Sequence, residues 1–436
     1  MNKQILNLAI PNVISNITVP FVGLVDIALA GRMSSPAYVG GIGFGTMLFT
    51  FIYTGLAFLR MGTTGLTAQA YGASNYEESS NTLFRALILS VSLGLILIIL
   101  QKPIEYIFIS GLSGSGDALN YAVEYFKVRI WAAPATLSVF VFMGWFIGMQ
   151  NSRIPMYITI LISVTNILLS ILFVLKFDMG IKGIALGTVL SQYTGLIASI
   201  VFYRFMFGNY FKYLNKNTIF NIQAIKKFFK VNSDIFIRSL LLTGSLFYFN
   251  AVSVELGDNI LALNSIMLQF LWFFSYVADG FSYAGGTLTG KFIGAGAGES
   301  LKLVIKKTVK FGFYLSLIFT LVYIIAGKYI FMLLTDNISI LELSQNYIHW
   351  IWILAMVSFM AFIYDGIYIG ATATKAMRNI MLIVVLCLYL PLLHILKYFY
   401  GNHGMWLALC VLFLARGIGL WLYSGKAILN KNITTF

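Results

Sequence analysis

The segment ILNLAIPNVISNITVPFVGLVDIALA, residues 5–30, holds one charged residue, Asp26, in an otherwise uncharged run. A helix of about 20 apolar residues crosses the hydrocarbon core of a bilayer, so this stretch is long enough to span a membrane. The rest of the 436-residue chain has the same character, with 59% hydrophobic and only 10% charged residues. A soluble domain carries roughly 25% charged residues. The composition therefore excludes a soluble protein and predicts that lipid solvates most of the chain.

Comparable apolar runs follow along the chain, and none shows the alternating pattern of a barrel strand. We therefore expect an all-α integral membrane protein with twelve transmembrane helices. The predicted spans are residues 5–30, 37–70, 82–100, 121–148, 154–175, 180–206, 234–256, 259–292, 304–333, 342–370, 377–398 and 403–425.

The formal charge is +14, from 29 Lys and Arg against 15 Asp and Glu. In a membrane protein such an excess marks the cytoplasmic loops, so membrane lipid is the expected partner and nucleic acid is not. Eighteen basic residues fall in loops on one side and six on the other. This split predicts a multi-pass membrane protein with both termini in the cytoplasm. The remaining five lie inside predicted spans: Arg60, Lys127, Arg129, Arg238 and Arg416.

The two halves of the chain resemble each other at a fixed offset of 222 residues. Gly72, Gly144 and Gly148 pair with Gly294, Gly366 and Gly370 at this offset. Six spans per half is an even number, so both halves enter the membrane in the same orientation. The pattern predicts two six-helix lobes related by a parallel pseudo-two-fold repeat, and such lobes suit a transporter that works by alternating access. We expect an N-terminal lobe at 1–206, a cytoplasmic linker at 207–232 and a C-terminal lobe at 233–436.

Polar residues of the first span share one face of the predicted helix. Asn12, Asn16 and Asp26 fall on this face, and Pro11 and Pro20 interrupt the same helix. Inserting a carboxylate within a span costs about 2.5 to 3.5 kcal/mol on insertion scales, and such a residue usually has a function. Asp26 is therefore a candidate functional residue on a helix able to bend, although a structural kink with a hydrogen-bonded Asp26 is the alternative.

Spans five and six carry hydroxyl and amide groups at helical spacing. Together with Asp26 these oxygens can surround a monovalent cation or position a proton-carrying carboxyl. Polar stripes also hold membrane helices together, and the sequence leaves that alternative open. The residues are Thr159, Ser163, Asn166 and Ser170 in span five, and Thr188, Ser191 and Gln192 in span six.

The second half has carboxylates beside aromatic residues. Gln269, Tyr276 and Asp279 share a face of span eight, and Asp365 lies in span ten. Carboxylates among aromatic rings suit an organic cation in a substrate cavity. They equally suit ion pairs with Arg238 and Arg416, and the sequence does not separate the two roles.

Several function classes find no support in the chain. No nucleophile motif, phosphate-binding loop or metal-ligand cluster is present, so an enzyme is not expected and no cofactor beyond a coupling ion is needed. A passive channel is disfavoured because the sequence contains no selectivity-filter motif. A monomer is expected because the predicted site lies within one chain.

Five motifs give the sequence a family resemblance over nearly its whole length. Taken together, the chain resembles the multidrug and toxic compound extrusion (MATE) transporters, in particular their DinF-like branch. The motifs are Val25-Asp26-Ile27-Ala28 with Gly31, Ala68-Gln69-Ala70-Tyr71-Gly72-Ala73, Asp279-Gly280-Phe281, Asp365-Gly366-Ile367-Tyr368-Ile369-Gly370-Ala371-Thr372, and Gly401-Asn402-His403-Gly404-Met405-Trp406-Leu407-Ala408.

The resemblance implies an antiporter that exports organic, cationic or amphipathic small molecules and couples to a cation at Asp26. In relatives, the residues that bind the cation together with this carboxylate correspond to Asn166, Ser170 and Thr188. Na⁺ is one ion that Asp26, Asn166 and Thr188 would hold. Relatives carry an aspartate where this chain has Ser170. The missing charge weakens Na⁺ binding, and burial of Asp26 favours its protonated form, so H⁺ is favoured while Na⁺ stays open. The alternative function is a lipid-linked glycan flippase of related architecture, because Arg60, Arg238 and Arg416 can bind phosphate.

Overall fold

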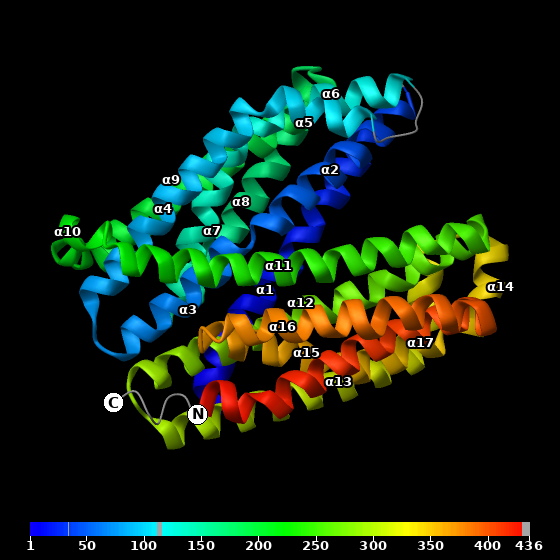
Figure 1. Ribbon diagram of the computed structural model, residues 1–436. Helices are drawn as coiled ribbons and strands as arrows, with labels where there is room; N and C mark the ends of the chain where they lie inside the picture. The colour runs from blue at the N-terminus through cyan, green and yellow to red at the C-terminus, as the bar shows by residue number, and fades with distance from the viewer. Residues whose placement is uncertain (34, 111–115, 430–436) are drawn as a thin grey trace. The chain divides into compact units, whose positions relative to one another are not determined.

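The computed structural model describes residues 1–33, 35–110 and 116–429, and every regular element in these ranges is a helix (Figure 1). Within lipid each backbone N–H and C=O group must find its partner inside the protein, which a helix achieves within one segment. The predicted all-α class is confirmed.

In the described ranges, nine α-helices lie between Asn2 and Phe207 and eight lie between Lys216 and Ser424. The first nine are α1 (Asn2–Ala30), α2 (Ala37–Leu56), α3 (Phe58–Gly72), α4 (Tyr76–Ile99), α5 (Gln101–Ser110), α6 (Gly116–Arg129), α7 (Ala133–Gly148), α8 (Arg153–Ile171) and α9 (Gly180–Phe207). The others are α10 (Lys216–Ile219), α11 (Ile222–Ser253), α12 (Asp258–Gly294), α13 (Gly298–Leu334), α14 (Ile338–Tyr347), α15 (His349–Gly370), α16 (Thr374–Ile383) and α17 (Leu390–Ser424).

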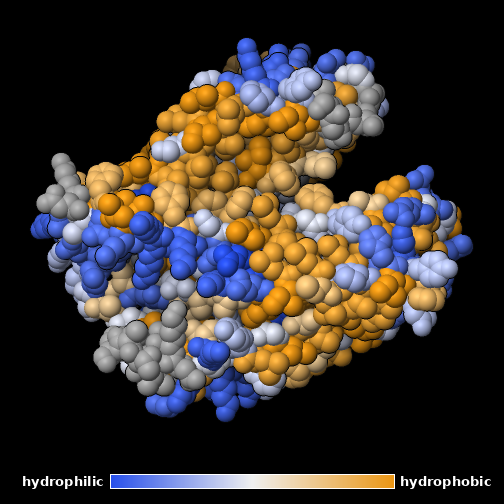
Figure 2. All heavy atoms as spheres, in the orientation of Figure 1, coloured by the Kyte–Doolittle hydropathy of each residue, from blue (hydrophilic) through white to orange (hydrophobic). Residues whose placement is uncertain are grey.

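Eleven segments of the described chain are long and apolar enough to cross a membrane. The last of them, Thr374–Leu429, has 56 residues and is broken at Gly401, whose φ of 53° a residue with a side chain rarely adopts. It therefore holds two crossings, and the expected twelve spans are accounted for. Figure 2 shows hydrophobic residues covering much of the helix surface and hydrophilic residues gathered near helix ends, as expected of a protein in lipid.

Contacts divide the chain into two compact units. The N-terminal unit comprises residues 14–71 and 75–229, and the C-terminal unit comprises residues 1–13, 72–74 and 230–436. Helix α1 thus contributes its first turns to one unit and the rest to the other. Its first turns pack Ile5, Leu8 and Ala9 against Ala284 and Leu288 of α12.

The repeat predicted from glycine spacing recurs as the same backbone contact inside each unit. A Cβ atom at Gly144 would overlap the backbone of Arg60, and one at Gly366 would overlap the backbone of Ser282. Arg60 and Ser282 are themselves 222 residues apart. Each unit therefore packs two helices through an equivalent glycine, α3 with α7 and α12 with α15, which supports the repeat independently of the sequence match.

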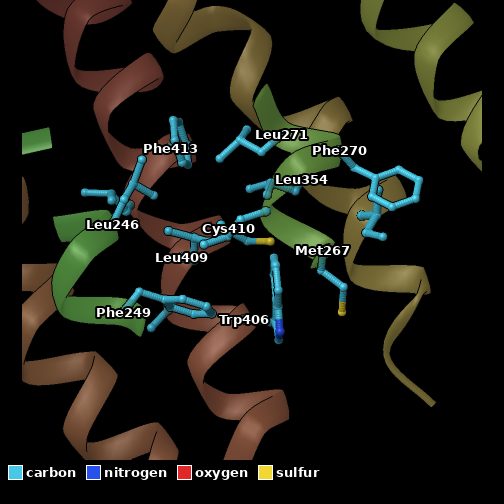
Figure 3. Packing of buried hydrophobic residues seen from close by; sticks show 14 of the residues in the cluster. Leu246, Phe249, Met267, Phe270, Leu271, Leu354, Trp406, Leu409, Cys410 and Phe413 are labelled. Carbon is cyan, nitrogen blue, oxygen red and sulfur yellow. The ribbon is translucent and has the colours of Figure 1, made fainter. Parts of the chain in front are cut away.

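The core of the C-terminal unit lies where α11, α12, α15 and α17 meet (Figure 3). Trp406 and Phe249 meet edge to face there, with ring centroids 5.1 Å apart. The indole N–H of Trp406 donates to Oδ1 of Asn264 at 2.8 Å, so the buried polar end of the ring is satisfied. This packing anchors the helix that follows the break at Gly401.

Two local expectations differ from the structure. Helix α11 begins at Ile222, inside the segment expected to form a linker, and continues into the seventh span. Ile225 and Phe228 continue its helical spacing and no glycine or proline follows to end it. Helix α1 also runs through Pro11 and Pro20 as one helical segment instead of being interrupted by them.

Candidate functional site

A pocket of about 480 Å³ lies inside the N-terminal unit. Residues of α1, α2, α3, α7, α8 and α9 line it, together with Arg129 at the end of α6. They come mostly from the middle of their spans, which places the pocket at membrane depth. The polar members of the lining are Ser15, Asn16, Asp26, Thr46, Thr50, Tyr53, Arg60, Arg129, Thr136, Thr159, Ser163, Asn166, Thr188, Ser191 and Gln192.

Asp26 is the one acidic residue of this lining. Its side chain belongs to α1 and only 7% of the residue's surface is exposed. Within residues 1–33, 35–110 and 116–429, Asp26 forms no ion pair and its Oδ1 accepts no hydrogen bond. A buried carboxylate without a partner is costly inside a membrane, so Asp26 is poised to bind something that enters the pocket.

Two of the expected partners of Asp26 meet on the wall formed by α8 and α9. Nδ2 of Asn166 donates to Oγ1 of Thr188 at 3.0 Å, and that hydroxyl donates to the carbonyl of Ile184 at 3.2 Å. Oδ1 of Asn166 is buried and receives no hydrogen bond from the described residues. The pair thus presents an acceptor oxygen in the same pocket as Asp26.

Ser170, the third expected partner, lies elsewhere. It is fully buried and is not part of the pocket lining. It packs against Gly187, where a side chain on the glycine would collide with the serine backbone and hydroxyl. Ser170 therefore contributes to the packing of α8 against α9.

Arg60 and Arg129 line the pocket although the sequence reading assigned neither to the Asp26 site. Nη1 of Arg129 donates to the hydroxyl of Tyr125 at 2.6 Å, and its guanidinium lies 4.7 Å from the centre of the Phe49 ring. Arg129 stands where α6 gives way to the short 3-10 turn Ile130–Ala132. Its place within a predicted span was the signal that could have identified it.

The buried charges of the C-terminal unit are arranged differently. Arg238 of α11 and Arg416 of α17 both pair with Oδ2 of Asp365 on α15. Asp279 of α12 also interacts electrostatically with both arginines. Of the two roles that the sequence left open for Asp365, the structure contains the ion pairs.

The other residues assigned to a substrate cavity are scattered. Asn16 lines the pocket of the N-terminal unit. Asn12 belongs to the C-terminal unit, where its Nδ2 donates to the carbonyl of Leu8 at 2.9 Å. Gln269 is exposed, and Tyr276 is half-buried on the same helix, α12.

The donor set around Asp26 suits a small cation or a proton. Carboxylate, amide and hydroxyl oxygens are the ligands of hard cations. Within the described part of the chain no three His, Cys, Asp or Glu side chains gather as they would around a transition metal. The chemistry that the pocket supports is reversible binding of a monovalent cation or H⁺ at Asp26.

Comparisons with known proteins agree with this arrangement. The MatE family model matches residues 11–172 and 235–395, one match in each half of the chain. The DNA damage-inducible protein F of Escherichia coli (strain K12) is 35% identical over 425 residues, covering 96% of this chain and 91% of that protein. The multidrug export protein MepA of Staphylococcus aureus (strain NCTC 8325 / PS 47) is 23% identical, with coverage of 92% and 89%.

The fold is shared with solved transporter structures. An outward-facing conformation of a multidrug resistance MATE family transporter of the MOP superfamily superposes with a TM-score of 0.90. The match covers 99% of this chain and 97% of that one at 20% sequence identity. At this identity the match establishes the fold of the chain as a twelve-span, two-lobed one.

Proposed function

The chain is a member of the MatE family of multidrug efflux transporters, and on that premise we propose that it is a cation-coupled antiporter that exports organic compounds. It is a transporter and not an enzyme. The observation that carries the coupling proposal is Asp26, a buried carboxylate that lines the pocket and forms no ion pair with any described residue. A cation that binds there neutralises a carboxylate that has no ion-pair partner within 4.0 Å among the residues that the structure describes.

The coupling ion is H⁺ in this proposal, and Na⁺ is the alternative. The pocket lining offers a single carboxylate, so a bound Na⁺ would rely on the neutral oxygens of Asn166 and Thr188 for its other protein ligands. A proton neutralises the carboxyl directly and needs no further ligands. No cofactor takes part.

The substrate is a small amphipathic molecule. The pocket volume falls within the roughly 300 to 1,000 Å³ of ligand sites, and apolar and aromatic side chains such as Val139, Phe140 and Met143 contribute to its walls. Binding of the coupling ion at Asp26, Asn166 and Thr188 changes the shape of α1 and expels the substrate. Residues of the C-terminal unit such as Gln269, Tyr276 and Asp279 stay candidate substrate contacts.

We also propose in which membrane the protein lies and on which side its termini are. The excess of basic residues on one side supports an orientation with both termini in the cytoplasm, and the relationship to the Escherichia coli protein supports the inner membrane of a bacterium as the location. The protein acts as a monomer, because one chain contains the complete pocket.

The test is transport by purified protein in liposomes with a fluorescent amphipathic substrate. A pH gradient and a Na⁺ gradient are imposed in separate experiments, and substrate movement against the ion flow is recorded. Stimulation by one gradient identifies antiport and its ion. A rate that equals that of protein-free liposomes under both gradients would contradict the proposal.

A lipid-linked glycan flippase is the second candidate, favoured by Arg60 and Arg129 in the pocket, since arginine binds phosphate well. A flippase needs no ion at Asp26. Movement of a polyprenyl phosphate sugar across the liposome without any gradient would support it, and it would be rejected if such a lipid does not bind.

A further inference from the structure

The segment between α9 and α11 joins the two halves of the chain, and α4 of the N-terminal unit holds it in place. Nε and Nη2 of Arg85 donate to the carbonyls of Ile219 and Thr218 at 2.7 and 2.6 Å. These carbonyls lie at the end of the short helix α10, where carbonyl groups lack partners within the helix. The hydroxyl of Ser80 also donates to the carbonyl of Tyr210 at 2.9 Å. The segment therefore has a fixed place on the N-terminal unit.

Large apolar side chains are exposed along this segment and at the start of α11. Phe211 is 60% exposed, and Phe220 and Ile222 are 65% and 68% exposed. Phe229 is half-exposed and, at 100° per residue, falls on the same face of α11 as Ile222. Apolar side chains of this size are costly to leave in water. Contact with lipid removes that cost.

The length of α11 places its first turns at the membrane surface. The helix has 32 residues, which is about 48 Å at 1.5 Å per residue, whereas the hydrocarbon core is about 30 Å thick. About a third of the helix therefore lies outside the core. The first turns are the part outside, because they contain Lys226 and Lys227 and charged side chains are costly in hydrocarbon. Figure 2 shows hydrophilic residues over the end of α11 near α10 and hydrophobic residues over its middle.

Four exposed basic residues at this end of the N-terminal unit lack an acidic partner. They are Arg204 at the end of α9, Lys212, Lys226 and Lys227. The chain contains no Asp or Glu between Asp178 and Asp234. In the part of the chain that the structure describes, none of the four forms an ion pair. Their charge is therefore available to an anion that approaches from outside the protein.

A phospholipid of the surrounding membrane fits this combination of charge and apolar surface. Lysine places its methylene groups along apolar surface while its ammonium group reaches the lipid headgroups. On α11, Lys226 lies on the face that Ile222 and Phe229 share, so acyl chains can contact the apolar side chains while the phosphate binds the lysine. We propose that the headgroups of anionic phospholipids bind to four basic residues: Arg204, Lys212, Lys226 and Lys227.

Net charge decides which lipid class binds. A zwitterionic lipid has the same phosphate, but its cationic group is repelled by the same basic residues. Phosphatidylglycerol has the phosphate and no cationic group, so it keeps a full negative charge for the lysines. Its binding holds the segment that joins the two halves at the membrane surface. The inference does not depend on the coupling ion or on the exported compound.

The test compares phosphatidylglycerol with phosphatidylcholine of identical acyl chains. Purified full-length protein in detergent is titrated with each lipid, and native mass spectrometry measures the apparent dissociation constant. The variants are Lys226→Gln, Lys226→Gln combined with Lys227→Gln, and Lys226→Arg, which keeps the charge. The matched control is Lys302→Gln. Lys302 is an exposed lysine near the start of α13, and its ammonium group already binds Glu299 at 2.9 Å.

We expect the native protein to bind phosphatidylglycerol at least roughly tenfold more tightly than phosphatidylcholine. One lysine near an anionic membrane surface contributes about fivefold in affinity. Lys226→Gln should therefore weaken phosphatidylglycerol binding about fivefold and leave phosphatidylcholine binding unchanged. The double variant should lose most of the preference. Lys226→Arg and Lys302→Gln should bind both lipids as the native protein does.

Three results would overturn the proposal: equal affinity of the native protein for the two lipids, an unchanged preference in the double variant, or the same loss in Lys302→Gln as in Lys226→Gln. The third result would mean that only the net charge of the protein matters. Glycerol 3-phosphate offers the phosphate without acyl chains. If it displaces phosphatidylglycerol at the concentration of the lipid itself, the residues bind free phosphate and the assignment to lipid is wrong. None of these outcomes alters the antiporter proposal.

Discussion

The two units of the molecule have the same glycine-to-backbone contacts between helices, but they differ in whether their buried charged side chains form ion pairs. In the N-terminal unit, Asp26 and Arg129 line one pocket and do not pair. In the C-terminal unit, Asp365 pairs with both Arg238 and Arg416. A charge that is already paired contributes to the fold, whereas a charge left unpaired at membrane depth is available to a ligand. This difference is why we propose that transport chemistry resides in the N-terminal unit.

The repeat itself shows how the units diverged. At the offset of 222, Arg129 corresponds to Ile351 and Asp365 corresponds to Met143. Ile351 is buried among apolar side chains of the C-terminal core, while Met143 lines the pocket of the N-terminal unit. Arg129 and Asp365 therefore each correspond to an apolar residue in the other unit, although the glycine contacts between the helices are equivalent.

The largest effect is expected from Asp26→Asn. The substitution removes the titratable group, so gradient-driven transport should fall to the rate of protein-free liposomes. Thermal stability should change little because no ion pair is lost. Transport and the unfolding midpoint in detergent are measured on the same preparation. Normal coupled transport by this variant would show that coupling does not require Asp26.

Asp365→Asn should mainly lower the stability of the protein. It leaves two buried arginines without their shared partner, which costs about 3 to 5 kcal/mol of unfolding free energy. The measurement is chemical or thermal unfolding in detergent. Replacing the whole cluster, with Asp365→Leu, Asp279→Leu, Arg238→Met and Arg416→Met together, should recover most of the loss, because no charge then remains without its partner. A stable Asp365→Asn protein that cannot transport would move the functional site to the C-terminal unit.

Substitution of the repeat glycines should affect both units alike. A methyl group at Gly144 or Gly366 meets backbone atoms of the neighbouring helix, so Gly144→Ala and Gly366→Ala should each cost about 1 to 3 kcal/mol. Gly244→Ala is the control, since the space beside Gly244 is open. If the two variants lose different amounts of unfolding free energy, the two equivalent contacts contribute differently to stability.

The smallest effect is expected from Thr188→Val, which removes the hydroxyl that Asn166 binds. One hydrogen bond contributes about 0.5 to 1.5 kcal/mol, so the ion concentration for half-maximal transport should rise roughly twofold to tenfold. Thr194→Val is a matched control on the same helix, where the hydroxyl donates to the carbonyl of Leu190 outside the pocket lining. An equal effect of both variants would argue against a role for Thr188 in ion binding.

Much of the architecture could be predicted from the sequence because lipid imposes strong rules. Span length, the absence of strand patterns and the glycine offset all follow from local sequence, and the structure places Gly144 and Gly366 in equivalent contacts. The division of helix α1 between the two units could not be predicted, because it depends on contacts made by its first turns with residues far along the chain.

The site was predictable only in part. Asp26, Asn166 and Thr188 were identified and line one pocket, while Ser170 follows the same helical spacing and faces Gly187 instead. Spacing gives the relative angle of residues on one helix but not which neighbour each face meets. Arg129 was not assigned to the site, because its position inside a predicted span marked it as unusual but did not show that it lines the same pocket as Asp26.

Release of the coupling ion on substrate binding is the most direct test of coupling at Asp26. Purified protein in weakly buffered detergent solution is mixed with a fluorescent amphipathic substrate, and released H⁺ is recorded with a pH indicator, with Na⁺ release followed in parallel. We expect release from the native protein and from Thr194→Val, and none from Asp26→Asn. Undiminished release from Asp26→Asn would contradict the claim that ion and substrate compete at this carboxylate.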